Sequence, residues 1–243
     1  MSNPDQQFFQ SAFSVDNIIF GFDEGDLKVL LIKRGNEPYK DHWALPGDLV
    51  YPDEDLDAAA ERILEQLTGL KNVFLEQVKT FGKVGRHPRG RVITVAYFSL
   101  IKISRYQVTA ASFAQKAQWI PVQEAQGLAF DHDVILKTCL LKLKELIQYR
   151  PLGFELLPPK FTLSQLQHLY EAILGTELDK RNFRKKILSM HLLADCEEIQ
   201  SGVAHRPARL FRFDRRQYEQ FQSGGFNFDI KIGRPRTHSD TAG

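Results

Sequence analysis

A basic loop near the middle of the chain carries the residues best suited to hold a small anionic ligand. Residues 82–91 combine arginines and a histidine, His87, with glycines and a proline. Glycine allows a ligand to approach the backbone closely, and the fork of an arginine matches the oxygens of a diphosphate. Aromatic rings elsewhere could stack on a base. We therefore expect a ligand site formed by Arg34, Trp43, Phe81, Arg86, Arg89 and Arg91.

A second group of charged residues lies in the last third of the chain. Residues 151–243 contain 14 Lys and Arg against 11 Asp and Glu, whereas residues 1–150 contain 18 against 19. Residues 179–190 alone contain five basic side chains and one acidic one. Such a cluster on a short element is typical of a surface that contacts a polyanion. On its own it would fit a solvated helix face better, so the element that carries it decides its meaning.

Apolar patterning places the basic loop in a domain of mixed α and β structure. Asp55 is a suitable N-cap for a helix, and Gly69 is a suitable C-cap. The sequence predicts strands at residues 14–22, 27–34, 72–81, 91–101 and 117–122, and helices at residues 55–68 and 130–149. These elements predict one domain over residues 1–150.

The elements after residue 150 follow a different order. Prolines and a glycine at residues 151–158 indicate a linker. A helix at 161–175, with Thr162 and Gly175 as its caps, precedes a second helix at 178–193. Two short strands at 195–214 surround a turn that contains Gly202. This order predicts a winged helix-turn-helix domain over residues 159–230, and residues 231–243 are expected to be a disordered tail.

Residues 43–70 resemble the Nudix box, G-x5-E-x7-R-E-U-x-E-E-x-G-U, where U is a bulky aliphatic residue. One extra residue separates the leading glycine from the first glutamate. The matching positions are Gly47, Glu54, Arg62, Leu64, Gly69 and Leu70. The resemblance implies a Nudix fold, an α/β/α sandwich with a mixed sheet. The expected fold class is therefore α+β, with a winged helix domain after the sandwich.

The box lacks the carboxylates that Nudix chemistry requires. Nudix hydrolases hold Mg²⁺ or Mn²⁺ on the glutamates of R-E-U-x-E-E, and the metal activates water. Ile63, Gln66 and Leu67 occupy those positions here. Glu65 lies one residue out of register, which is about 100° around a helix. We therefore expect no catalytic residue, no bound metal and no cofactor, so the chain is not expected to be an enzyme.

The whole arrangement resembles the Nudix-related transcriptional regulators of NAD metabolism. The segments that carry this resemblance are residues 13–22, the altered box, residues 75–100, residues 161–188 and residues 206–213. It implies a dimeric repressor of genes for NAD biosynthesis or salvage. It also implies that ADP-ribose, or a related nucleotide, binds the Nudix domain and releases double-stranded, palindromic operator DNA.

A winged helix inserts the N-terminal part of its second helix into the major groove. Arginine and lysine pair with guanine there, and asparagine pairs with adenine. The side chains expected to face DNA bases are Lys180, Arg181, Asn182, Arg184 and Lys185, while His205, Arg206 and Arg209 of the wing are expected to contact phosphates. The apolar side chains expected to face the domain core are Phe183, Ile187 and Leu188.

Two alternatives remain open on the sequence. One is a Nudix pyrophosphatase that cleaves ADP-ribose or a sugar nucleotide, with a C-terminal dimerisation module. The other is a regulator of the same architecture that responds to a sugar or sugar phosphate. Release of AMP would favour the enzyme, and a ligand screen would separate the two kinds of effector.

The composition indicates a protein of the cytoplasm that does not enter a membrane. The chain has no run of about 20 apolar residues. Its first residues also lack the basic and apolar regions of a signal peptide. Cys139 and Cys196 match no metal or redox spacing, and two such thiols suit a reducing compartment.

Overall fold

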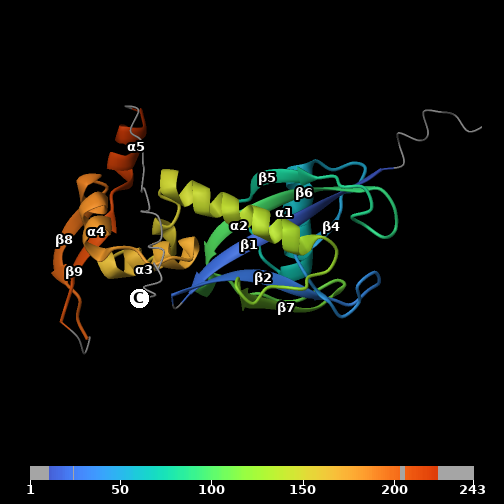
Figure 1. Ribbon diagram of the computed structural model, residues 1–243, viewed down its shortest axis with the longest axis horizontal. Helices are drawn as coiled ribbons and strands as arrows, with labels where there is room; N and C mark the ends of the chain where they lie inside the picture. The colour runs from blue at the N-terminus through green and yellow to red at the C-terminus, as the bar shows by residue number, and fades with distance from the viewer. Residues whose placement is uncertain (1–10, 24, 203–205, 224–243) are drawn as a thin grey trace, which may run out of the picture. The chain divides into compact units, whose positions relative to one another are not determined.

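A mixed seven-stranded sheet forms the centre of the first of two units in the computed structural model, which describes residues 11–23, 25–202 and 206–223 (Figure 1). The strands are β1 (Ala12–Asp23), β2 (Asp26–Arg34), β3 (Trp43–Ala44), β4 (Gly47–Leu49), β5 (Glu76–Phe81), β6 (Val92–Lys102) and β7 (Ala114–Pro121). Their order is β3-β2-β1-β6-β5, while β4 pairs with β1 and β7 with β2. The β1–β6 pair is parallel and every other pair is antiparallel.

Two helices cover opposite faces of this sheet. Side chains alternate between the faces along β1. Val15 packs in one cluster with Ile63 of α1 (Leu56–Thr68). From the other face, Asp16 reaches His132, the first residue of α2 (His132–Tyr149). The unit is therefore an α/β/α sandwich, which confirms the predicted fold class.

Unit 1 spans Met1–Leu143 and unit 2 spans Lys144–Gly243, so the division falls within α2. Unit 2 contains the short 3-10 turn η3 (Phe154–Leu156), the helices α3 (Leu163–Leu174), α4 (Lys180–Ser189) and α5 (Arg215–Ser223), and the strands β8 (Leu193–Ile199) and β9 (Arg209–Phe213). Another 3-10 turn, η2 (Ile103–Arg105), belongs to unit 1. The strands β8 and β9 form an antiparallel hairpin. Two helices followed by a hairpin are the predicted winged helix.

Local chemistry explains where the helices of unit 2 begin. The hydroxyl of Thr162 accepts the backbone N–H of Gln165, and the side chain of Gln165 accepts the N–H of Thr162, which completes a capping box. Asp179 caps α4 by accepting the N–H of Asn182 at 2.8 Å. Gly175 ends α3 with a φ of 68°, a conformation that glycine adopts without strain.

The structure differs from the predicted elements at several ends. The second helix stops at Ser189 because His191 turns the chain with a φ of 54°, and β8 follows. Phe130 has a φ of 57°, so α2 begins after it. The helix α5 was not predicted. Within the segment expected to be a linker, the ring of Phe154 stacks on Phe213 at 4.4 Å and is buried.

In the part of the chain that the structure describes, no helix combines the length and the apolar character needed to span a membrane.

Candidate functional site

A pocket of about 420 Å³ opens where the start of β1, the end of β2, β4 and the loop at residues 82–91 meet. Arg34, Arg86, Arg89 and Arg91 all line it. We call this cavity the arginine pocket. Other lining residues are Asp16, Asp48, His87, Phe113, Phe130 and His132. The fold thus gathers four guanidinium groups around one cavity, one from the end of β2 and three from the loop at residues 82–91.

Arg34 stands in the wall of this pocket between two aromatic rings. Its guanidinium carbon lies 5.2 Å from the centre of the Phe113 ring and 5.0 Å from that of Phe130, so both rings make cation–π contacts. Its Nε donates to the carbonyl of Pro38 at 2.9 Å. Burial lowers the pKa of Arg34, yet a guanidinium keeps its charge at neutral pH. Among the described residues, no carboxylate lies within ion-pair distance of it. Asp48 and Asp16 favour its charge from a greater distance, and the guanidinium keeps donors that a ligand can use.

Arg86 forms the floor of the pocket and is held by carboxylates. Its Nε and Nη2 donate to the two oxygens of Asp131 at 3.0 and 2.7 Å, which is a bidentate pair. Its Nη2 also lies 3.6 Å from Asp16, which accepts the hydroxyl of Thr94 at 2.8 Å. Only 4% of the Arg86 side chain is exposed. The cation is thus neutralised by its own surroundings before any ligand arrives.

His132 completes this buried network as a neutral ring. Its Nδ1 accepts the backbone N–H of Leu45 at 2.9 Å, so the proton resides on Nε2. That nitrogen lies 3.4 Å from Asp16. Burial lowers the pKa of His132, which favours the uncharged form.

The rim of the pocket is more exposed than its floor. Arg89 donates to the carbonyl of Glu37 at 2.7 Å, and Arg91 donates to the carbonyl of Gly82 at 2.5 Å. Each of these guanidinium groups has five donors and uses one in these contacts. The ring of His87 stacks on Phe130, with centres 5.1 Å apart, and burial lowers its pKa. The rim can therefore offer several further N–H groups to an anion.

Two of the six predicted ligand residues lie elsewhere. Trp43 lies in β3 beneath the Lys116 amine, and Phe81 ends β5 beside Lys79; neither lines the pocket. The aromatic rings of the pocket are Phe113 and Phe130, which sequence reasoning missed. No spacing marks them, because both belong to loops that the fold brings back to the sheet. Asp16, also missed, had a signal, since it is a carboxylate within an apolar strand.

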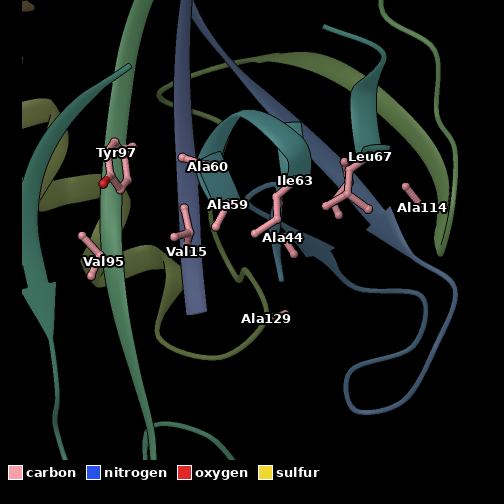
Figure 2. Close-up of a cluster of buried hydrophobic side chains, with 11 residues drawn as sticks. Val15, Ala44, Ala59, Ala60, Ile63, Leu67, Val95, Tyr97, Ala114 and Ala129 are labelled. Atoms are coloured by element: carbon pink, nitrogen blue, oxygen red, sulfur yellow. The ribbon is translucent and has the colours of Figure 1, made fainter. Parts of the chain in front are cut away.

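The altered Nudix box forms α1, and its inner face packs into the core. Ile63 and Leu67, which replace two of the expected glutamates, are 0% and 1% exposed. Figure 2 shows both side chains pointing into the cluster of buried residues. Aliphatic side chains have no donor atom for a metal ion. Among the described residues, no three His, Cys, Asp or Glu side chains gather in a way that could hold one.

The polar residues of α1 bind one another instead. Arg62 forms an ion pair with Glu54, donates to Gln66 at 3.0 Å and donates to the carbonyl of Leu49 at 3.0 Å. The hydrogen bond with Arg62 lowers the pKa of Glu54. Glu65 is exposed and pairs with Lys71 at 2.6 Å. Arg62 thus connects α1 to the loop before it. The carboxylates of Glu54 and Glu65 are each paired with a cation, so this arrangement does not fit the binding of Mg²⁺.

The helix α4 of unit 2 carries the predicted DNA-binding residues. Phe183 and Ile187 are 5% and 2% exposed and face the core, as predicted. The prediction for Leu188 was wrong, because its side chain is 43% exposed. Leu188 lies about 100° around the helix from Ile187, which takes it out of the core. The exposed residues Arg181, Asn182 and Lys185 lie on the same outward side, which we call the outer face.

The other predicted DNA-binding residues lie beside a groove. Lys180, Arg184, Arg206 and Arg209 line a cavity of about 980 Å³ between α3, α4 and the β8–β9 hairpin. Arg209 also pairs with Asp195 at 2.6 Å. His205, predicted to contact phosphates, lies outside the described residues.

Comparison with known families matches each unit separately. Residues 11–139 match the NUDIX domain, and residues 153–213 match the NrtR DNA-binding winged helix domain.

One relative, the ADPR responsive transcriptional repressor NtrR of Acinetobacter baylyi, is similar to nearly the whole chain. It is 39% identical over 232 residues, which cover 93% of this chain and 89% of the relative. An ADP-ribose pyrophosphatase of Methanocaldococcus jannaschii is 33% identical over 130 residues, 54% of this chain and 73% of that protein. Among solved structures, Shewanella oneidensis NrtR complexed with a 27mer DNA matches with a TM-score of 0.69 and 27% identity, over 90% of this chain and 99% of that one.

Proposed function

The chain belongs to the family that joins a NUDIX domain to an NrtR DNA-binding winged helix domain, and we propose that it is a transcriptional repressor released from its operator by ADP-ribose. The observation that carries this proposal is the similarity along 93% of the chain to an ADPR responsive repressor. The genes it controls are those of NAD biosynthesis or salvage.

The winged helix supports the DNA-binding half of the proposal. The outer face of α4 presents Arg181, Asn182 and Lys185 to solvent. Because these side chains are exposed, they can contact DNA without leaving the core. These are side chains that can pair with guanine and adenine in the major groove. Arg206 and Arg209 of the hairpin suit phosphates. We propose a homodimer on a palindromic operator, because the symmetry of such sites mirrors that of the protein.

The arginine pocket supports the effector half. ADP-ribose joins two sugars through a diphosphate, so it needs cationic forks near the centre of its site and apolar surface near its base. Arg34, Arg89 and Arg91 offer the forks, and Phe113 and Phe130 offer the surface. A neutral sugar would leave these cations unpaired, so the pocket favours an anionic ligand over a plain carbohydrate.

The altered Nudix helix α1 does not support hydrolysis of that ligand. A pyrophosphatase that uses the Nudix route needs carboxylates on the inner face of α1, and that face holds Ile63 and Leu67 in the core. We propose that unit 1 binds ADP-ribose and leaves it intact. The enzyme remains the second candidate because one relative is an ADP-ribose pyrophosphatase.

A ligand screen on the full chain tests the proposal. ADP-ribose should raise the melting temperature, whereas AMP, ribose 5-phosphate and free sugars should raise it less at equal concentration. With MgCl2 or MnCl2 present, ADP-ribose should be recovered unchanged. A shift with sugar phosphates alone would overturn the effector, and metal-dependent release of AMP would establish the enzyme instead.

The positions of these two sites assign one function to each domain. We propose residues 1–150 as the effector-binding domain and residues 159–230 as the DNA-binding domain, acting in the cytoplasm where operator DNA and nucleotides meet. Limited proteolysis followed by binding assays on the fragments would test these boundaries.

A further inference from the structure

The groove of unit 2 is lined by cations contributed by three elements. Lys180 and Arg184 come from α4, and Arg206 and Arg209 come from the wing strand and the turn before it. Ser164 adds a hydroxyl from α3. None of the described residues that line the groove is acidic. A cavity with this lining attracts an anion rather than an apolar or cationic group.

Arg184 is fixed in this groove by α3. Its Nη2 donates to the hydroxyl of Ser164 at 3.0 Å. Its Nε is buried and, in the part of the chain that the structure describes, has no hydrogen-bond partner. A guanidinium carries five N–H donors, so Arg184 keeps donors for a further acceptor. The buried Nε is closed to an incoming oxygen, so the donors available to a ligand are those of the terminal nitrogens that Ser164 does not use.

The position of Arg184 on the helix separates it from the outer face. Successive residues of an α-helix are about 100° apart, so Lys185 points about 100° away from Arg184. Residues four apart share one side, which puts Lys180 next to Arg184 along the groove. Lys185 is exposed, whereas Arg184 is only partly accessible. The basic cluster of α4 therefore divides into an outer row and a groove row.

We propose that Arg184 and Ser164 together form a seat for one backbone phosphate of the DNA, and that Arg184 does not read a base. A guanidinium beside a hydroxyl is a common pair of phosphate donors, and a side chain tied to α3 has little reach into the major groove. The proposal rests on the proposed DNA-binding function. It leaves sequence discrimination to Arg181, Asn182 and Lys185.

Contacts to phosphates and contacts to bases have different effects on the measured affinity for DNA. A phosphate contact contributes equally to every sequence and raises the dependence on salt, whereas a base contact contributes to discrimination. The experiment uses the full chain and two duplexes, one selected by the wild-type protein from a random-sequence library and one unrelated. Fluorescence anisotropy would measure the Kd of each duplex at several salt concentrations.

Replacing Arg184→Ala should weaken binding to both duplexes by about the same factor, roughly tenfold, and lower the slope of log Kd against log salt by about one. Ser164→Ala should weaken both duplexes equally, by a smaller factor. Arg181→Ala should instead reduce the ratio between the duplexes. Lys186→Ala, which removes the same charge from the far side of α4, serves as the matched control and should change the slope less than Arg184→Ala.

In Arg184→Ala, a change in the ratio between the duplexes would overturn the phosphate seat, and so would a salt slope equal to that of the wild type. Arg184→Gln preserves most of the side-chain volume, so it gives the same test if the alanine variant unfolds. Failure of the wild-type chain to bind either duplex would overturn the proposed function itself, which distinguishes the two failures.

Discussion

Arginines line both the pocket of unit 1 and the outer face of α4 in unit 2, but they are held in different ways. Arg86 lies on the pocket floor between Asp131 and Asp16, and Arg34 is clamped between two rings. Arg181 and Lys185 stand in water. A small ligand gains from cations that are already oriented, because little order must be created when it binds. DNA instead binds to a solvated surface. The cations of this surface contact phosphates and bases, and the counterions around the DNA are released.

The largest expected consequence of this difference concerns stability. Arg86→Ala would leave Asp16 and Asp131 without their cation, and removing one partner of a buried ion pair costs about 3–5 kcal/mol. Arg181→Ala, on an exposed face, should change the free energy of unfolding by less than about 0.5 kcal/mol. Urea unfolding of both variants measures the contrast. Equal stabilities would show that the pocket floor is not an interdependent network.

The next effect concerns DNA. Replacing Arg181 and Lys185 together with alanine should lower the affinity for a selected duplex by about a hundredfold, because base contacts are worth about 1–3 kcal/mol each. The melting temperature should stay close to that of the wild type, since neither side chain is buried. Anisotropy and thermal melting give the two readouts. Wild-type affinity in this double variant would remove α4 from the interface.

A smaller effect is expected for the effector. Arg34→Ala removes one charged fork and should weaken ADP-ribose binding by about ten- to thirtyfold. Arg105→Ala, an exposed arginine of η2 that does not line the pocket, is the matched control and should bind as the wild type does. Isothermal titration calorimetry measures both. If the two variants bound ADP-ribose equally, the ligand would lie outside the arginine pocket.

The smallest expected effect is on the pH dependence of the free energy of unfolding. The pKa of His132 is lowered in the folded protein, whereas an unfolded histidine titrates near 6.5. The unfolded state therefore binds more protons below that pH, and the free energy of unfolding falls as the pH drops through about 6.5. His132→Asn should show a shallower decline in urea unfolding. A steeper decline in this variant would contradict the assignment of a neutral ring.

Sequence reasoning recovered what depends on local pattern. Apolar periodicity predicted α1, α3 and the strands β1, β2, β5, β6 and β7, whereas the short strands β3 and β4 were not predicted; Thr162 and Gly175 marked the ends of α3. The basic, glycine-containing loop was predicted to contact a ligand because it follows a strand beside the Nudix box. Its arginines Arg86, Arg89 and Arg91 line one pocket, and their contact with a ligand stays a prediction. The pattern also predicted that Ile63 and Leu67 would stand where metal ligands are needed.

What it missed depends on contacts between distant segments. Phe113 and Phe130 lie beside Arg34 only after the chain has folded, whereas Trp43, which the motif favoured, lies outside the pocket. Leu188 was assigned to the core from its spacing of five from Phe183, although one step of the helix past Ile187 places it in solvent. The tie between Arg184 and Ser164 joins two helices, so no spacing within α4 could have predicted it.

The most direct test of the proposed function follows a preformed complex of the full chain with its selected duplex while ADP-ribose is added. The account predicts that ADP-ribose releases the DNA in a saturable manner, that the nucleotide is recovered intact, and that Arg34→Ala needs about ten- to thirtyfold more of it. DNA that stays bound at saturating ADP-ribose, or release that occurs only as AMP is formed, would contradict it.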